Sequence, residues 1–142
     1  MAEQIKDLIN TGTTVVIDRY YYSGCVYSAA KQNPSMDLNW CRHMEVGLPR
    51  PDLCLFLDVA PEEQERRGGF GNERYEKRGL QDRVRELFSE MRTHGDERDD
   101  IVVVDAGSGV EDVEKNIQRV VSARFEKEGA GNGPLRFIRS WS

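Results

Sequence analysis

The chain has 142 residues, a length typical of one domain with a core of its own. Its net charge of −5, with 38% hydrophobic and 32% charged residues, argues against a nucleic-acid-binding coat. No stretch is long enough to span a membrane, and residues 1–12 lack the apolar core of a signal peptide. The sequence therefore predicts an intracellular protein without membrane or nucleic-acid partners. Its three cysteines have no CxxC or Cys/His spacing, which predicts thiols rather than disulfides or a zinc site.

The first predicted unit is a helix followed by a strand. Residues 2–10 carry apolar side chains at helical spacing, and Gly12 is well placed to end this helix. The β-branched run at residues 13–17 predicts an inner strand of a parallel sheet. Asp18 and Arg19 follow at its carboxyl end, where open α/β sheets bind their ligands. The alternative interpretation is an ordinary ion pair at the end of a strand.

Two short helices and a stiff loop are predicted next. Residues 25–31 favour a helix that Asn33-Pro34 ends, and residues 37–46 favour another. Residues 47–52 read Gly-Leu-Pro-Arg-Pro-Asp. Each proline fixes its own φ and restrains the residue before it, so this segment predicts a stiff loop.

A second strand and a basic, glycine-rich segment come after that loop. Residues 53–59 predict a buried strand that again includes an aspartate near its end, and Pro61 is typical of the first turn of a short helix. Residues 66–79 interleave glycines with arginines, which is typical of a mobile lid that closes over anions. An ordinary solvated surface loop is the alternative.

The last part of the chain predicts two more helices around a third strand. Residues 80–92 form an amphipathic helical pattern, and residues 95–100 predict a polar turn. Residues 101–106 predict the third buried strand, and a helix with one apolar face follows Gly109. Residues 126–142 predict a flexible tail with at most weak docking. Three strands alternating with helices predict an α/β fold with a parallel sheet.

Four motifs taken together resemble the thymidylate kinases. They are the strand end Asp18-Arg19-Tyr20 with Ser23, the loop 47–52, the lid segment 67–76 and the strand end Val104-Asp105-Ala106. The resemblance covers roughly residues 3–121, and ordered motifs at compatible spacing are more specific than any one alone. It implies a P-loop nucleoside-monophosphate-kinase fold with flanking helices, of which residues 1–125 are the C-terminal portion. The residues would supply strands 3, 4 and 5 of the family sheet.

The resemblance implies transfer of the γ-phosphoryl group of ATP to dTMP, giving dTDP, with Mg²⁺ as the cofactor. Arg19 matches the arginine that clamps phosphate, and Asp18 would orient it and contact the metal through water. The residues that match the dTMP site are Ser23, Tyr27, Tyr75, Glu76 and Gln81. Those that match the adenine side of the ATP site are Arg67, Gly107, Ser108 and Val110.

Some of these residues have structural alternatives. For Tyr27 the alternative is core packing, because aromatic side chains usually bury themselves first. The glycines on either side of Ser108 are explained by a strand end followed by a helix start. The family resemblance further implies a homodimer located in the cytoplasm, the nucleus or both.

The sequence contains no G-x-x-x-x-G-K-[ST] phosphate loop, which the family places well before Asp18-Arg19. That loop carries the amides and the lysine that cradle the ATP phosphates. In the family strand order 2-3-1-4-5, strand 1 lies between the strands expected at residues 13–17 and 53–59. We therefore expect a gap in the sheet, low stability and no catalysis by these residues alone, as for a truncated gene model or a fragment of a full enzyme.

Two other functions stay open from the sequence. The first is a non-catalytic binding or assembly role, in which residues 25–31 pair this chain with a full-length kinase. The second is another phosphate-loop nucleoside or nucleotide kinase. Tyr75 and Gln81 argue against the second, because they match the dTMP site of the family specifically.

Overall fold

The computed structural model describes residues 1–67, 74–128 and 133–141. The elements in chain order are α1 (Ala2–Asn10), α2 (Tyr21–Ala30), α3 (Leu38–His43), β1 (Cys54–Asp58), α4 (Pro61–Arg67), α5 (Arg74–Met91), α6 (Gly95–Asp100), β2 (Ile101–Asp105) and α7 (Val110–Glu128). Among the helices of these residues, none is both long and apolar enough to cross a membrane.

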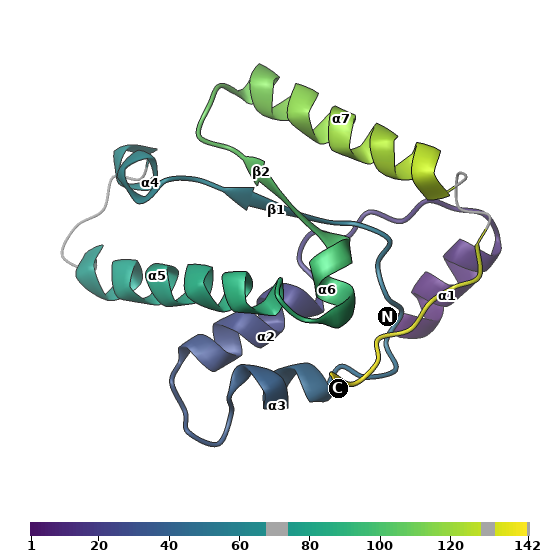
Figure 1. Ribbon diagram of the computed structural model, residues 1–142, viewed down its shortest axis with the longest axis horizontal. Coiled ribbons are helices and arrows are strands. Elements are labelled where there is room, and N and C mark those ends of the chain that lie inside the picture. The colour runs from purple at the N-terminus through teal and green to yellow at the C-terminus, as the bar shows by residue number, and fades with distance from the viewer. Residues whose placement is uncertain (68–73, 129–132, 142) are drawn as a thin grey trace.

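The two strands form a parallel sheet between two layers of helices. The register runs from Cys54 opposite Ile101 to Asp58 opposite Asp105, so both strands end in an aspartate at the same edge of the sheet. Figure 1 shows α7 on one side of the sheet and α5, α2 and α3 on the other. Helix α1 lies on the side at which the two strands begin. This is the α/β arrangement that the alternation of strands and helices predicts.

The core lies between the sheet and the layer formed by α2, α3 and α5. Val26 on α2 and Met91 on α5 have no exposed surface. The ring of Phe56 on β1 packs against Phe88 on α5 with centroids 4.4 Å apart. Burial of such apolar side chains is the main favourable contribution to folding. Through Phe88, α5 packs against the sheet as well as against the rest of the core.

The structure confirms most of the predicted helices and explains where they begin and end. Helix α1 stops before Gly12, whose φ of +82° is the left-handed conformation that glycine adopts without strain. Helix α3 begins after Asp37, because the Asp37 carboxylate accepts a hydrogen bond from the amide of Trp40 at 2.8 Å. Helix α2 begins at Tyr21, four residues earlier than predicted.

The strand predicted at residues 13–17 is absent from the structure. These residues have no regular secondary structure, and the side chain of Val16 is 93% exposed. Within the described residues the sheet consists of β1 and β2 alone. A strand needs a neighbour to pair its amide and carbonyl groups, and β-branched residues do not form one by themselves. Residues 13–17 therefore add no strand to the sheet beside β1.

The polar turn predicted at residues 95–100 is wrong, because this segment forms the helix α6. Its pattern gives no apolar stripe, yet Glu97 and Asp100 are both buried. Arg42 pairs with Glu97, and Arg50 pairs with Asp100. Buried carboxylates are tolerated when arginines pair with them, and pairs 50 or more residues apart are invisible to a local sequence pattern.

The segment predicted as a flexible tail differs in its boundary and in its contacts. Helix α7 continues to Glu128, beyond the expected start of the tail. Of the residues after the helix, Ile138 is 2% exposed and belongs to the core cluster. Phe137 forms an antiparallel bridge with Pro49, which lies in the loop predicted to be stiff. The chain therefore returns to the core after α7, as Figure 1 shows in yellow.

Truncation of the core side chain at position 91 should destabilise the fold strongly. We expect Met91→Ala to lower the free energy of unfolding by about 2–5 kcal/mol, because it leaves a cavity under α5. Met44→Ala is the matched control, since Met44 is 64% exposed and its truncation should change stability by about 0.5 kcal/mol or less. Urea unfolding followed by circular dichroism measures both, and equal effects would contradict the assigned core.

Candidate functional site

A large cleft occupies the space beside β1 where the predicted strand pairing is missing. Its volume is about 880 Å³, and it is bounded by α1, residues 14–20, α2, β1, α5 and α7. Most of its wall is apolar, but charged side chains line it as well, among them Asp18, Arg19, Asp58 and Arg85. Asp58 ends β1, and Arg85 pairs with it. We call this space the central cleft. Charged groups in an apolar cleft at strand ends are typical of a ligand site.

Three of the residues that the sequence assigns to the dTMP site come together in the central cleft. The guanidinium of Arg19 lies 5.5 Å from the centroid of the Tyr27 ring, a distance at which a cation is attracted to an aromatic face. The amide Nε2 of Gln81 donates a hydrogen bond to the Tyr27 hydroxyl at 3.4 Å. Tyr27 on α2 thus connects the arginine before α2 with the glutamine on α5.

The backbone at Arg19 is in an unusual conformation. Its φ is +63°, in the left-handed region that non-glycine residues rarely adopt. Such a conformation costs roughly 1–3 kcal/mol and persists only where surrounding contacts enforce it, often at functional sites. Ser23, also in the cleft wall, donates from Oγ to the carbonyl of Tyr20 at 3.2 Å and so helps to hold the turn into α2. Its observed contact is with the backbone.

Asp18 lines the central cleft and is exposed. Within the described residues its carboxylate makes no ion pair, and no group of three or more potential ligands could hold a metal directly. Mg²⁺ keeps several of its own waters and needs only one or two carboxylates, so Asp18 fits a water-mediated contact. The chemistry of this residue is therefore compatible with magnesium.

The residues assigned to the adenine side form a separate group. Arg67 at the end of α4 reaches the turn after β2, and its guanidinium donates to the carbonyls of Ala106 at 3.1 Å, Gly107 at 3.4 Å and Ser108 at 3.3 Å. Glu63 accepts from Nε of the same arginine at 2.9 Å. A planar guanidinium held on two sides in this way has one fixed orientation.

A cavity of about 650 Å³ lies beside this arginine and extends along the first turns of α7. Ser108 and Val110 line it together with Arg67, whereas Gly107 contributes the carbonyl that Arg67 binds. A Cβ atom at Gly107 would lie 3.1 Å from Oδ1 of Asp105, which accepts a hydrogen bond from the Gly107 amide. The turn is thus tight and also lies close to the cavity. Its glycines fit a wall of the adenine site and also a simple connection from a strand end to a helix start.

Two of the sequence-assigned residues cannot be placed fully. Tyr75 and Glu76 belong to the first turn of α5, and their side chains lie outside the described residues. Residues 68–73, the centre of the predicted lid, lie outside them as well. Residues 74–79, predicted as part of the lid, instead form the beginning of α5. Arg78 in this part of the helix pairs with Glu65 on α4 at 2.9 Å.

Sequence reasoning missed Arg85, a basic residue in the lining of the central cleft. Arg85 lies 3.2 Å from the Asp58 carboxylate, and it also donates a hydrogen bond to the carbonyl of Val59. It therefore places a positive charge at the carboxyl end of β1. A signal was available, because Arg85 follows Gln81 by four positions on α5 and so shares its helix face.

The pKa values of all three cysteine thiols are raised. Burial raises the pKa of Cys25 on α2 to about 12, and burial also raises the pKa of Cys54, which lines the central cleft, to about 12. Burial likewise raises the pKa of Cys41. All three are free cysteines. A thiol must lose its proton to act as a nucleophile or a metal ligand, so the raised pKa values disfavour both roles.

Several known proteins are similar to this chain. A family model described as thymidylate kinase matches residues 1–117. The thymidylate kinase of Arabidopsis thaliana is 40% identical over 97% of this chain and 48% of that protein, and the human thymidylate kinase is 41% identical over 83% and 53%. A solved structure of thymidylate kinase from Candida albicans superposes with a TM-score of 0.71 at 31% identity, and covers 97% of this chain and 67% of that one.

These similarities and the architecture agree on the class of protein. Parallel strands between helical layers, with charged side chains beyond the strand ends, define an α/β fold of the P-loop kinase type. Within this class, the chain belongs to the thymidylate kinase family. It spans about half the length of the curated relatives that it matches.

The raised thiol pKa values predict very slow alkylation of the folded protein. A pKa near 12 leaves about one thiolate in ten thousand at pH 8, so Cys25 and Cys54 should react with iodoacetamide about a thousandfold more slowly than an exposed cysteine. Mass spectrometry of peptides measures the rates, and labelling in 8 M urea is the control in which all three cysteines react. Rapid labelling of either residue in the native protein would contradict the assigned environment.

Proposed function

We propose that this chain carries the dTMP-binding part of a kinase that transfers the γ-phosphoryl group of ATP to dTMP, giving dTDP. The observation that supports this function is the contact of Arg19, Tyr27 and Gln81 in the central cleft. The family's members include thymidylate kinases at 35–42% identity over most of this chain, which makes dTMP the first substrate to test.

Each of the three residues has a chemical role in this proposal. Arg19 supplies a permanent positive charge whose fork of N–H donors fits two oxygens of the dTMP phosphate. The Tyr27 ring gives an apolar wall for the nucleoside and holds the arginine by its face. Gln81 presents an amide that can both donate and accept hydrogen bonds, as pyrimidine recognition requires. Tyr75, Glu76 and Ser23 complete the proposed acceptor side.

The donor side of the proposed reaction lies at the cavity beside Arg67. The adenine of ATP would occupy the space next to Ser108 and Val110, against the flat face of the Arg67 guanidinium. Arg67 is suited to this role because its contacts with Glu63 and three carbonyls already fix its plane. A preorganised group binds with a smaller loss of conformational entropy.

Asp18 would hold Mg²⁺ through a coordinated water, and the ion would neutralise charge on the transferred phosphoryl group. Phosphoryl transfer depends chiefly on positioning and charge neutralisation, so the residues of this chain act by binding and orienting. Asp18 and Arg19 are adjacent in sequence and both line the central cleft. In the proposed site they bring one negative and one positive group to the place where the two substrates meet.

The proposed activity needs phosphate-binding groups that the printed sequence does not contain, since no G-x-x-x-x-G-K-[ST] motif occurs in it. The 142 residues alone are therefore proposed to bind dTMP without turning it over. An assembly role with a full-length kinase is the alternative. For that role, residues 25–31 offer little free surface, because Cys25, Val26, Ala29 and Ala30 are buried in this chain's own core.

Removal of the cleft arginine should abolish the contribution of the phosphate to binding. We expect dTMP to bind more tightly than thymidine to the wild-type chain. Arg19→Ala should bind the two equally, because the phosphate is the only part of dTMP that the guanidinium is proposed to contact. Arg92→Ala is the matched control and should behave as wild type, because Arg92 is an exposed arginine in the turn directly after α5. Isothermal titration calorimetry measures the affinities, and an unchanged preference for dTMP in Arg19→Ala would refute the assigned role.

The second test concerns turnover. With ATP, Mg²⁺ and dTMP, the chain alone is expected to form no dTDP above a blank without protein, because a missing phosphate-site arginine or lysine costs several orders of magnitude in rate. Chromatographic detection of dTDP measures this outcome, and an intact thymidylate kinase is the positive control. Detectable dTDP would show that the 142 residues are catalytically sufficient.

A further inference from the structure

Residues 135–141, which we call the C-terminal strap, lie against the loop that precedes β1. The amide of Gly47 donates to the carbonyl of Ile138 at 2.9 Å, and the amide of Ile138 donates to the carbonyl of Leu48 at 2.9 Å. The amide of Arg50 donates to the carbonyl of Arg136 at 2.8 Å. Three backbone hydrogen bonds thus fix the loop and the strap in one antiparallel register.

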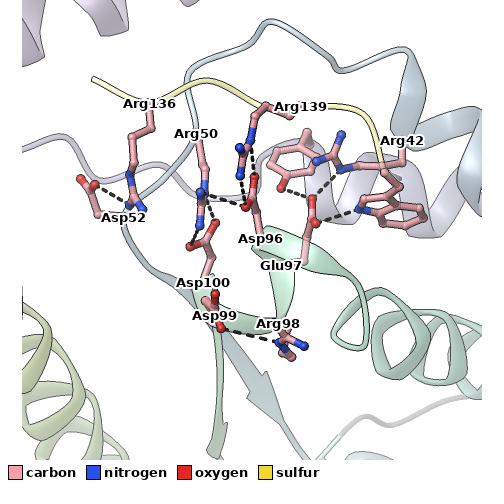
Figure 2. A network of polar contacts seen from close by, with 12 residues as sticks. Arg42, Arg50, Asp52, Asp96, Glu97, Arg98, Asp99, Asp100, Arg136 and Arg139 are labelled. Carbon is pink, nitrogen blue, oxygen red and sulfur yellow. Dashed lines mark hydrogen bonds and ion pairs between the residues drawn. The ribbon is translucent and has the colours of Figure 1, made fainter. Parts of the chain in front are cut away.

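The side chains of the strap bind acidic residues of the same region, as Figure 2 shows. Arg136 pairs with Asp52 at 3.0 Å, and Arg139 pairs with Asp96 on α6 at 2.8 Å. The hydrogen bond from Arg139 holds the pKa of Asp96 below its usual range. Exposed pairs of this kind contribute little energy each, so they set the position of the strap more than its stability.

The end of the strap reaches a buried carboxylate. Trp141 donates from its indole nitrogen to Oε2 of Glu97 at 2.9 Å, while Arg42 donates to Oε1. The indole also stacks on His94, with centroids 4.1 Å apart. Glu97 has no exposed surface, so its hydrogen bonds are made inside the protein, where each is worth more than at the surface.

The two residues that follow Arg19 form hydrogen bonds with residues that also contact the C-terminal strap. The hydroxyl of Tyr20 donates to the carbonyl of Pro49 at 3.1 Å, and Pro49 forms the bridge with Phe137 of the strap. The hydroxyl of Tyr21 donates to Oε1 of Glu97 at 2.8 Å, the carboxylate that Trp141 binds through its other oxygen. Two separate paths thus connect the strap to the beginning of α2.

From this arrangement we propose that the C-terminal strap is a positioning element for Arg19, acting through Tyr20 and Tyr21. The proposal rests on the proposed function in so far as Arg19 binds the dTMP phosphate. A left-handed arginine persists only where its surroundings enforce the conformation. Here the two following residues are anchored and the Arg19 side chain is exposed apart from its contact with the Tyr27 ring, so the anchors define where its backbone lies.

The strap lies outside the residues that the family model matches, which end at 117. It contributes no residue to the lining of the central cleft except Leu135. Its effect on binding would therefore be exerted through other residues, and Tyr20 and Trp141 are positioning residues in this proposal.

The test uses Trp141→Phe and Tyr20→Phe in the full 142-residue chain. Trp141→Phe keeps an aromatic ring beside His94 but removes the N–H that binds Glu97, and Tyr20→Phe removes only the hydroxyl that binds Pro49. Trp40→Phe is the matched control, because the Trp40 side chain is 47% exposed on α3 and is outside this network. The readouts are the Kd for dTMP, the NMR signal of the Arg19 Nε–H group, and the melting temperature.

We expect each of the two variants to bind dTMP at least about fivefold more weakly and to shift the Arg19 Nε–H signal, at a temperature well below melting. Trp40→Phe should leave both unchanged. A lower melting temperature with an unshifted Arg19 signal and an unchanged Kd would overturn the proposal, because it would assign the strap a purely structural role.

The Arg19 Nε–H signal does not depend on dTMP binding, so it can test the role of the strap separately from the proposed function. If the wild-type chain does not bind dTMP, the proposed function fails, and the strap is judged by the Arg19 signal alone. A shift in both variants then supports positioning, and unshifted signals overturn it.

Discussion

The buried carboxylate of Glu97 is the constraint on which much of this structure depends. Its two oxygens accept hydrogen bonds from Arg42 on α3, Tyr21 on α2 and Trp141 near the end of the chain. Removing one partner from a buried charged pair typically costs about 3–5 kcal/mol, because the remaining charge is left without compensation. Three segments far apart in sequence must therefore meet at α6, and this meeting fixes how α2, α3 and the end of the chain are arranged.

The same meeting point determines the surroundings of the candidate site. Helix α2 is held at its beginning by Tyr21, and the next turn of that helix carries Tyr27 into the central cleft. Arg19 then lies over the Tyr27 ring, and Gln81 reaches the same ring from α5. Arg19 is thus located by rigid elements on both sides, although its own side chain is exposed to solvent. Rigid support of this kind is what an exposed binding residue requires.

The candidate site itself was predictable in part. A motif match located Arg19, Tyr27, Gln81, Arg67 and Ser108, and the structure divides them between two regions, the central cleft and the cavity beside Arg67. The match did not include Arg85, although its spacing from Gln81 places both on one helix face, and its pairing with Asp58 on β1 is seen only in the tertiary structure. It also could not provide the left-handed backbone of Arg19, which depends on contacts made by the residues after it.

The sequence by itself determined the helices α1, α3 and α7, the part of α5 from residue 80 onward, and the strands β1 and β2, because hydrophobic periodicity and capping residues act over a few neighbouring positions. It also determined the family, through motifs that are short and local. Only the tertiary structure decided that residues 13–17 form no strand, that residues 95–100 form a helix, and that the end of the chain docks. Each of these outcomes depends on a partner many residues away, a neighbouring strand or a buried ion pair, and no local pattern contains that information.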